Sequence, residues 1–129
     1  MASIAISVGD AFLIDTPPNA QHLYIAIAQI SETHYLFVNV TSRPIRSDTS
    51  CILQPGEGIQ FIKRESFIAY KFAREMDATQ LATEIMPNSP IPKEIVPPDI
   101  LSRIQQGGLK SKLLKNRYKK ALKAFLDLS

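Results

Sequence analysis

Few residues of this chain could carry out acid–base or nucleophilic chemistry. It has two histidines, His22 and His34, and a single cysteine, Cys51. Cys51 could act as a nucleophile with a histidine as its base, but it begins an apolar segment, and free cysteine is among the most buried residue types. His34 alternates with Leu36 and Val38, which favours a structural role in a strand. His22 follows a loop and directly precedes an apolar segment, a better position for an active-site base.

Motifs for metals and cofactors are not found. The sequence has no phosphate-binding glycine loop, no Cys-x-x-Cys and no His-x-x-x-His. Two isolated histidines and one cysteine are too few for a structural zinc site. We therefore expect neither a metal nor a cofactor.

Several basic side chains fall in predicted loops or at predicted strand ends, namely Arg43, Arg46, Lys63, Arg64 and Arg74. If they converge on one rim of a barrel, they could bind phosphate or stabilise charge that develops on phosphorus. The aromatic rings of Phe61 and Tyr70 would then be candidates to stack on an unpaired base. The alternative is a set of ordinary surface charges above core aromatics.

Basic charge is concentrated toward the C-terminus. Residues 103–129 hold 8 of the 15 Lys and Arg residues and one of the 12 acidic residues. A basic ridge of Lys112, Lys115, Lys119 and Lys123 recurs there at three- and four-residue spacing beside an apolar stripe, so we expect one amphipathic helix over residues 111–128. Such a ridge suggests an anionic partner such as single-stranded RNA or another nucleic acid. A solvated helix face is the alternative.

Short strands must position the candidates of the N-terminal half. Segments rich in β-branched and aromatic residues predict strands at residues 11–14, 23–28, 34–41, 51–53, 59–62 and 67–73. Residues 15–22 contain two prolines and are expected to form a loop, and Pro55-Gly56 fits a type II turn. Five or six short strands in about 65 residues suggest a small closed barrel.

The C-terminal half has helical periodicity. Asp77, with Gln80 three residues later, predicts a capped helix to about residue 85. Residues 86–98 hold five of the nine prolines, so we expect an extended arm lying along the body. A short helix at residues 99–106 is expected to stop at Gly107-Gly108. The fold class is mainly β with C-terminal helices, and residues 1–129 form one domain, with a barrel at residues 9–76 and the arm and helices at 77–129.

Composition agrees with a compact protein of the cytoplasm. The apolar fraction is 45% and the charged fraction 21%, which are ordinary values for a globular chain. No apolar stretch approaches the 18 residues of a membrane span, and the N-terminus lacks the pattern of a signal peptide. One cysteine cannot form an internal disulfide, which fits a reducing compartment. We expect cytoplasmic localisation and no membrane partner.

Three short motifs follow one another along the N-terminal part of the chain. They are Gly9-Asp10 followed by Phe12-Leu13-Ile14-Asp15, then Val40-Thr41-Ser42, and then Lys63-Arg64-Glu65-Ser66-Phe67-Ile68 before a strand that carries Arg74. In this order of motifs, residues 9–81 resemble the PemK/MazF toxin family. The resemblance implies an SH3-like barrel, commonly a homodimer, that cleaves single-stranded RNA without a metal and is paired with an antitoxin protein.

The resemblance also assigns roles to particular residues. Thr41 and Ser42 match the polar pair that lines the family's groove, and Arg74 matches a basic position in its last barrel strand. His22-Leu23 stands where the family has Arg-Pro. An attack of the RNA 2′-hydroxyl on the adjacent phosphate needs a base, an acid and a cation. His22 would be the base or acid, Arg74 or Arg46 the cation, and Thr41 and Ser42 would position the phosphate.

Two alternatives remain open. The first is a non-catalytic SH3-like module that binds nucleic acid or a protein partner through its rim and its basic C-terminal helix. The second is that this helix pairs with a second copy of the chain and builds a homodimer.

Overall fold

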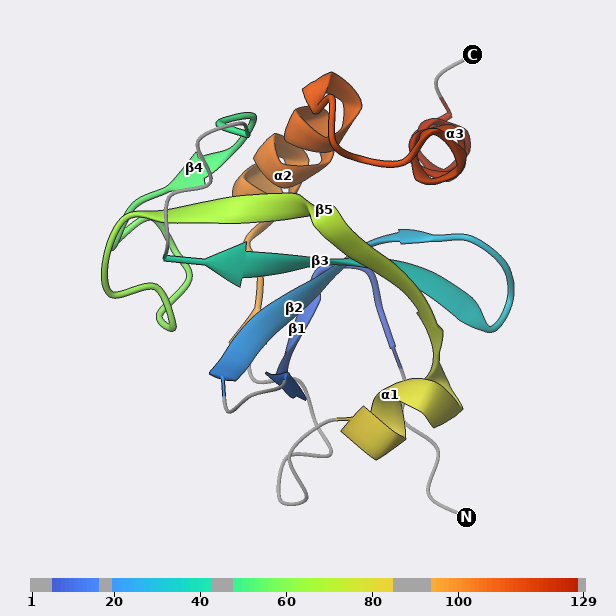
Figure 1. The fold of residues 1–129 in the computed structure, drawn as a ribbon, viewed down its shortest axis with the longest axis horizontal. Helices are drawn as coiled ribbons and strands as arrows, with labels where there is room; N and C mark the ends of the chain where they lie inside the picture. The colour runs from blue at the N-terminus through green and yellow to red at the C-terminus, as the bar shows by residue number, and fades with distance from the viewer. Residues whose placement is uncertain (1–5, 17–19, 43–47, 85–93, 128–129) are drawn as a thin grey trace.

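One curled antiparallel sheet with three helices makes up the computed structural model, which describes residues 6–16, 20–42, 48–84 and 94–127 (Figure 1). The strands have the spatial order β4-β5-β3-β2-β1-β6. They are β1 (Asp10–Thr16), β2 (Ala20–Gln29), β3 (His34–Thr41), β4 (Ile52–Leu53), β5 (Ser66–Asp77) and β6 (Glu94–Ile95). The helices are α1 (Ala78–Glu84), α2 (Pro98–Lys110) and α3 (Asn116–Phe125). The prediction of a mainly β chain with C-terminal helices is confirmed.

Two irregularities in strand pairing help the sheet to curl into a half-barrel. The pairing of β2 with β3 shifts between Ala26 and Ala28. A larger shift occurs between β3 and β5, where β3 advances from Phe37 to Asn39 while β5 passes from Arg74 to Ala69. Bulges of this kind bend a strand and increase its twist, which makes a half-barrel possible from so few strands.

Both faces of the sheet are covered. α2 and α3 lie on one side and α1 on the other (Figure 1). Side chains alternate between the two faces along each strand, so each face contributes to its own core. The larger core, on the side of α2 and α3, includes Leu23, Ile25, Val38, Ile104 and Leu122. The smaller core, on the side of α1, includes Phe12, Ile14, Tyr24, Phe37 and Leu81.

Helix α2 continues through the two glycines that were expected to end it. A Cβ atom at position 107 would lie 2.5 Å from the Tyr70 hydroxyl oxygen, 2.9 Å from the Cys51 Cβ and 2.9 Å from the Ser50 carbonyl oxygen. The predicted helix end at this point is wrong, because Gly107 serves close packing of the helix against the chain beneath it and not a change of backbone direction.

The helix ends instead at Ser111, which was expected to begin the next one. Ser111 is fully buried, and its hydroxyl donates a hydrogen bond to Asp48 Oδ2 at 2.8 Å. The Leu113 backbone N–H donates to Ser111 Oγ at 3.1 Å, which turns the chain. α3 therefore starts only at Asn116, and the predicted single helix over residues 111–128 is wrong at its N-terminal end.

The segment between β4 and β5 is only partly as expected. The Pro55-Gly56 turn is confirmed, since Gly56 has a φ of 86° and the Glu57 N–H bonds to the Gln54 carbonyl at 3.4 Å. The strand expected at residues 59–62 is wrong. Backbone N–H groups of Gln60 and Phe61 donate to the two carboxylate oxygens of Glu94, both at 2.6 Å, so they are not available to a strand ladder.

Other expectations have mixed outcomes. β2 begins at Ala20, so the loop predicted to extend to His22 is shorter and His22 lies in a strand. Asp77 caps α1 as expected, because its Oδ1 accepts from the Gln80 N–H at 2.7 Å. Most of the proline-rich arm lies outside the described residues, but its end forms β6 and pairs with β1, as an arm lying along the body should. Among the described residues, the helices are too short and too polar to cross a bilayer.

Candidate functional site

Two of the candidate catalytic residues meet at one end of the sheet, on the face that α1 covers. His22 in β2 pairs with Ile14 of β1, which belongs to the smaller core, so the His22 side chain is on that face. Leu23 pairs with Val40 at the end of the ladder between β2 and β3, and His22 and Thr41 are the residues that follow this pair, so continuing the register by one step would set them opposite each other. Side chains at such directly opposed positions lie roughly 5 Å apart. Both residues are half-buried, which suits a group that contacts a ligand.

Arg74 shares this face but lies farther along it. It pairs with Phe37, another member of the smaller core. Phe37 precedes Thr41 by four residues on β3, a distance of roughly 13 Å at about 3.3 Å per residue. The backbone of Arg74 is therefore on the same face of the sheet as His22 and Thr41, but roughly 13 Å farther along it than Thr41.

Asn39 lies between these positions and was not identified from the sequence. It pairs with Tyr24 on one side and Ala69 on the other, and it is only 6% exposed. Its Oδ1 has no hydrogen-bond partner among the described residues, a costly state for a buried carbonyl oxygen. The sequence does mark this residue, because Asn39 is the only side-chain amide in the otherwise mostly apolar segment HYLFVNVT. We call His22, Asn39, Thr41 and Arg74 the polar row.

The remaining candidate residues are not part of the polar row. Ser42 is exposed in a bend after the end of β3. Arg43 and Arg46 lie outside the described residues. Lys63 and Arg64 are exposed in the segment that joins β4 to β5.

The basic ridge expected from four lysines is also broken up. Lys112 lies in the segment between α2 and α3, Lys115 is at the N-cap position of α3, and only Lys119 and Lys123 lie within that helix. α3 lies on the side of the sheet opposite to α1, whereas the polar row lies on the α1 side (Figure 1). The structure therefore separates the predicted catalytic residues from the predicted basic helix.

Cys51 and Tyr70 are packed in the core. Cys51 is 6% exposed, and burial raises the pKa of its thiol, which disfavours the reactive thiolate. The Tyr70 hydroxyl donates to the Ile104 carbonyl at 2.5 Å, and burial raises the pKa of this hydroxyl as well. Because Tyr70 is buried, it cannot stack on a base, and the alternative of a core aromatic holds for it; Phe61 is partly buried and packs against the same core.

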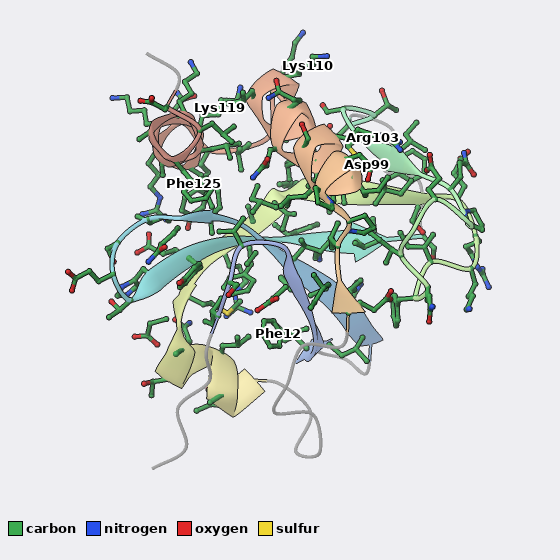
Figure 2. All side chains as sticks on the ribbon, turned by 180° about the vertical axis from the view of Figure 1, so that it is seen from behind. Phe12, Asp99, Arg103, Lys110, Lys119 and Phe125 are labelled. Carbon is green, nitrogen blue, oxygen red and sulfur yellow. The ribbon has the colours of Figure 1, made fainter. Side chains whose placement is uncertain are left out.

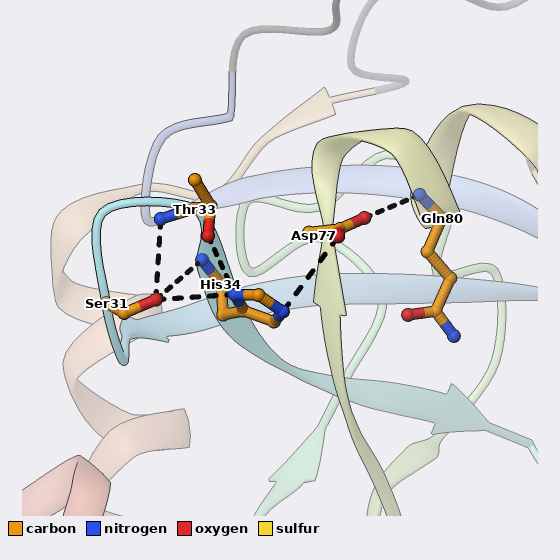
Figure 3. A network of polar contacts seen from close by, with 5 residues as sticks. All are labelled: Ser31, Thr33, His34, Asp77 and Gln80. Atoms are coloured by element: carbon orange, nitrogen blue, oxygen red, sulfur yellow. Dashed lines mark hydrogen bonds and ion pairs between the residues drawn. The ribbon is translucent and has the colours of Figure 1, made fainter.

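His34 joins hydroxyl groups to a carboxylate (Figure 3). Its Nδ1 lies 2.8 Å from Thr33 Oγ1 and 3.3 Å from Ser31 Oγ, and its Nε2 lies 3.9 Å from Asp77 Oδ2. Ser31 Oγ also accepts from the His34 backbone N–H at 3.2 Å, which closes the turn between β2 and β3. Because Asp77 also caps α1, this network fixes a turn and a helix start, in agreement with the structural role expected for His34.

A hollow of about 220 Å³ lies between α2 and the start of β4, lined by Ser50, Cys51, Ile52, Arg103, Gln106, Gly107 and Lys110. Arg103 is already engaged there, since it donates to Glu57 Oε2 at 2.7 Å and to the Ile52 carbonyl at 2.8 Å. Within the described ranges, no group of three or more His, Cys, Asp or Glu residues could hold a metal ion.

Comparison with protein-family models gave no match, and neither did comparison with curated proteins.

Proposed function

We propose that this chain is an SH3-like barrel related to the PemK/MazF toxins, which binds single-stranded RNA along the polar row and cleaves it. One observation carries the proposal. His22, Thr41 and Arg74 come from three separate strands, and all three are on one face of the sheet. The buried Asn39 Oδ1 beside them favours a ligand that offers a hydrogen-bond donor.

The chemistry follows from the spacing of the row. His22 is within reach of the same phosphate as Thr41 and would accept the proton of the 2′-hydroxyl. The 2′-oxygen then bonds to phosphorus, the bond from phosphorus to the 5′-oxygen breaks, and that oxygen takes up a proton. The Thr41 hydroxyl would hold a phosphate oxygen. At roughly 13 Å, Arg74 is better placed for a neighbouring phosphate of the strand than for the reacting one.

The same proposal includes the partners that the resemblance implies and the location that the cysteine content favours. The partners are a second copy of the chain in a homodimer and an antitoxin protein, and the location is the cytoplasm, which the single cysteine favours. The chain's single cysteine, Cys51, is buried and has a free thiol, which is compatible with that compartment.

Cleavage of a mixed-sequence single-stranded RNA in the presence of EDTA tests the proposal. We expect fragments that end in a 2′,3′-cyclic phosphate and a 5′-hydroxyl, and at least a 100-fold loss of rate in His22→Ala, since general acid–base catalysis contributes about 10²–10⁴-fold. His34→Gln is the matched control and should keep the activity, because His34 lies in the turn network and not in the polar row. RNA left intact by the native chain, or equal losses in the two histidine variants, would overturn it.

A further inference from the structure

The surface formed by the end of α2, the following segment and α3 is unusually rich in positive charge. We call it the cationic surface; it consists of Lys110, Lys112, Lys115, Arg117, Lys119, Lys120 and Lys123. Six of these side chains are exposed, Lys119 is half-buried, and no acidic residue occurs between Asp99 and Asp127. Across the described part of the chain, no carboxylate forms an ion pair with any of them.

Core packing fixes the orientation of α3. Tyr118 and Leu122 are buried in the larger core, so the opposite side of α3 faces solvent. Lys120 and Lys123 are three residues apart on that side, and Lys119 and Lys123 are four apart, which places neighbours about 5–6 Å from one another at Cβ. Figure 2 shows Lys110 and Lys119 on the two helices, away from Phe12, which lies beneath the sheet.

Arg117 is positioned more tightly than a free surface arginine. Its guanidinium carbon lies 4.7 Å from the centre of the Tyr118 ring, and its Nη2 donates to the Tyr118 hydroxyl at 3.1 Å. The cation is therefore held at the edge of the cationic surface, and its remaining N–H groups stay available to an anion.

We propose that the cationic surface binds the phosphate backbone of nucleic acid without reading its sequence. An array of cations that form no ion pair within the described residues is complementary to a row of phosphates, and the neighbouring Asp48 carboxylate already accepts a hydrogen bond from the buried Ser111. A membrane surface fits less well, because α3 has already buried the apolar side chains, Tyr118 and Leu122, that would have to enter the lipid. An acidic protein fits less well too, because lysine is depleted from interface cores and only Phe125, 39% exposed, offers an aromatic anchor here.

This binding is independent of the chemistry proposed for the polar row, which lies on the other face of the sheet. It also gives a specific form to the alternative of a non-catalytic binding module. The two surfaces can therefore be disabled separately.

Salt-dependent binding of a labelled 20-nucleotide RNA of mixed sequence tests the proposal. For single strands, each cation that contacts phosphate contributes about 0.7 to the slope of log K against log salt. Lys120→Gln/Lys123→Gln should lower the slope by about 1.4, and the affinity at 0.1 M salt by about 25-fold if the variants converge at 1 M. Glutamine keeps much of each side chain's length, so packing should change little.

The matched control changes net charge by the same amount on the other side of the sheet. Thr79→Glu/Ala82→Glu adds two negative charges on exposed positions of α1. We expect the control to keep the native slope, because charges beyond a Debye length of about 10 Å at 0.1 M salt are screened.

Three results would overturn the proposal. They are binding that does not depend on salt, equal losses in the lysine variant and its control, and competition by polyglutamate as effective as that by unlabelled RNA. A chain that shows the expected slope but never cleaves RNA would instead refute only the proposed enzymatic function.

Discussion

Replacing Gly107 by alanine distinguishes two physical roles for a glycine in this chain. At a position inside a helix where nothing packs against the glycine, alanine would stabilise the protein by about 1 kcal/mol through its higher helix propensity. The structure predicts the opposite, because α2 already continues through this position and passes very close to the residues beneath it. The sign of the change in stability therefore decides between the two roles.

The magnitude follows from three contacts. A Cβ at position 107 would lie 2.5 Å from the Tyr70 hydroxyl and 2.9 Å from both Cys51 Cβ and Ser50 O. Two of these atoms belong to rigid parts of the chain, so overpacking should cost about 1–3 kcal/mol. Moving Tyr70 would also break its bond to the Ile104 carbonyl and leave a buried hydroxyl unpaired, at about 1–3 kcal/mol. After subtraction of the helix gain, we expect a net loss of about 3 kcal/mol.

Gly108→Ala is the matched control, one residue along the same helix. Its Cβ would lie 3.0 Å from Leu122 Cδ2 and 3.3 Å from Tyr70 Cε1, both of which are side-chain atoms that can yield slightly. Its gain in helix propensity should offset most of this, leaving a change within about 1 kcal/mol. Urea unfolding followed by far-UV circular dichroism suits a chain without tryptophan. A Gly107→Ala protein as stable as the native chain would refute the close-packing role.

Two further predictions concern buried polar groups. Asn39→Leu should raise the free energy of unfolding by about 1–2 kcal/mol in urea titrations, because it removes a buried oxygen that has no hydrogen-bond partner among the described residues. The same substitution should weaken RNA binding at the polar row. A loss of stability with unchanged RNA binding would contradict both parts. The stability of the native chain should fall as pH rises above about 9. In the unfolded chain the Cys51 thiol and the Tyr70 phenol have pKa values near 9.0 and 10.0, whereas burial raises both pKa values in the folded chain. Above pH 9 the unfolded chain therefore loses protons that the folded chain keeps, which favours unfolding. Cys51→Ala should fall less steeply across pH 9–10, and an identical profile would contradict the assignment.

Local patterns were enough to predict the central hairpin. β3 spans the predicted residues 34–41, because alternating β-branched and aromatic side chains there agree with the sheet that forms. The turn before it needs only Ser31 and its neighbours, whose side chains bond to their own backbone. The Asp77 cap is likewise a local interaction, so sequence spacing could reveal it.

Contacts between distant segments were not predictable in this way. The glycines of α2 signal a helix end when read locally, and only the proximity of Tyr70 and Cys51 gives them another role. Glu94 binds backbone groups 33 and 34 residues away and thereby removes a predicted strand. Similarly, the meeting of His22 with Thr41 depends on β2 beginning at Ala20, which the two prolines of the preceding segment obscured.

The separation of the two candidate surfaces constrains how RNA could use both. The polar row and the cationic surface lie on opposite faces of the sheet, and helices cover each face (Figure 1). A strand that touches both must pass around an edge or an end of the sheet, so a short oligonucleotide should occupy one surface at a time. If the cationic surface only captures RNA, its loss should raise KM for long RNA and leave kcat unchanged. A very short substrate, which cannot span the two, should then be cleaved equally well by the native chain and the Lys120→Gln/Lys123→Gln variant.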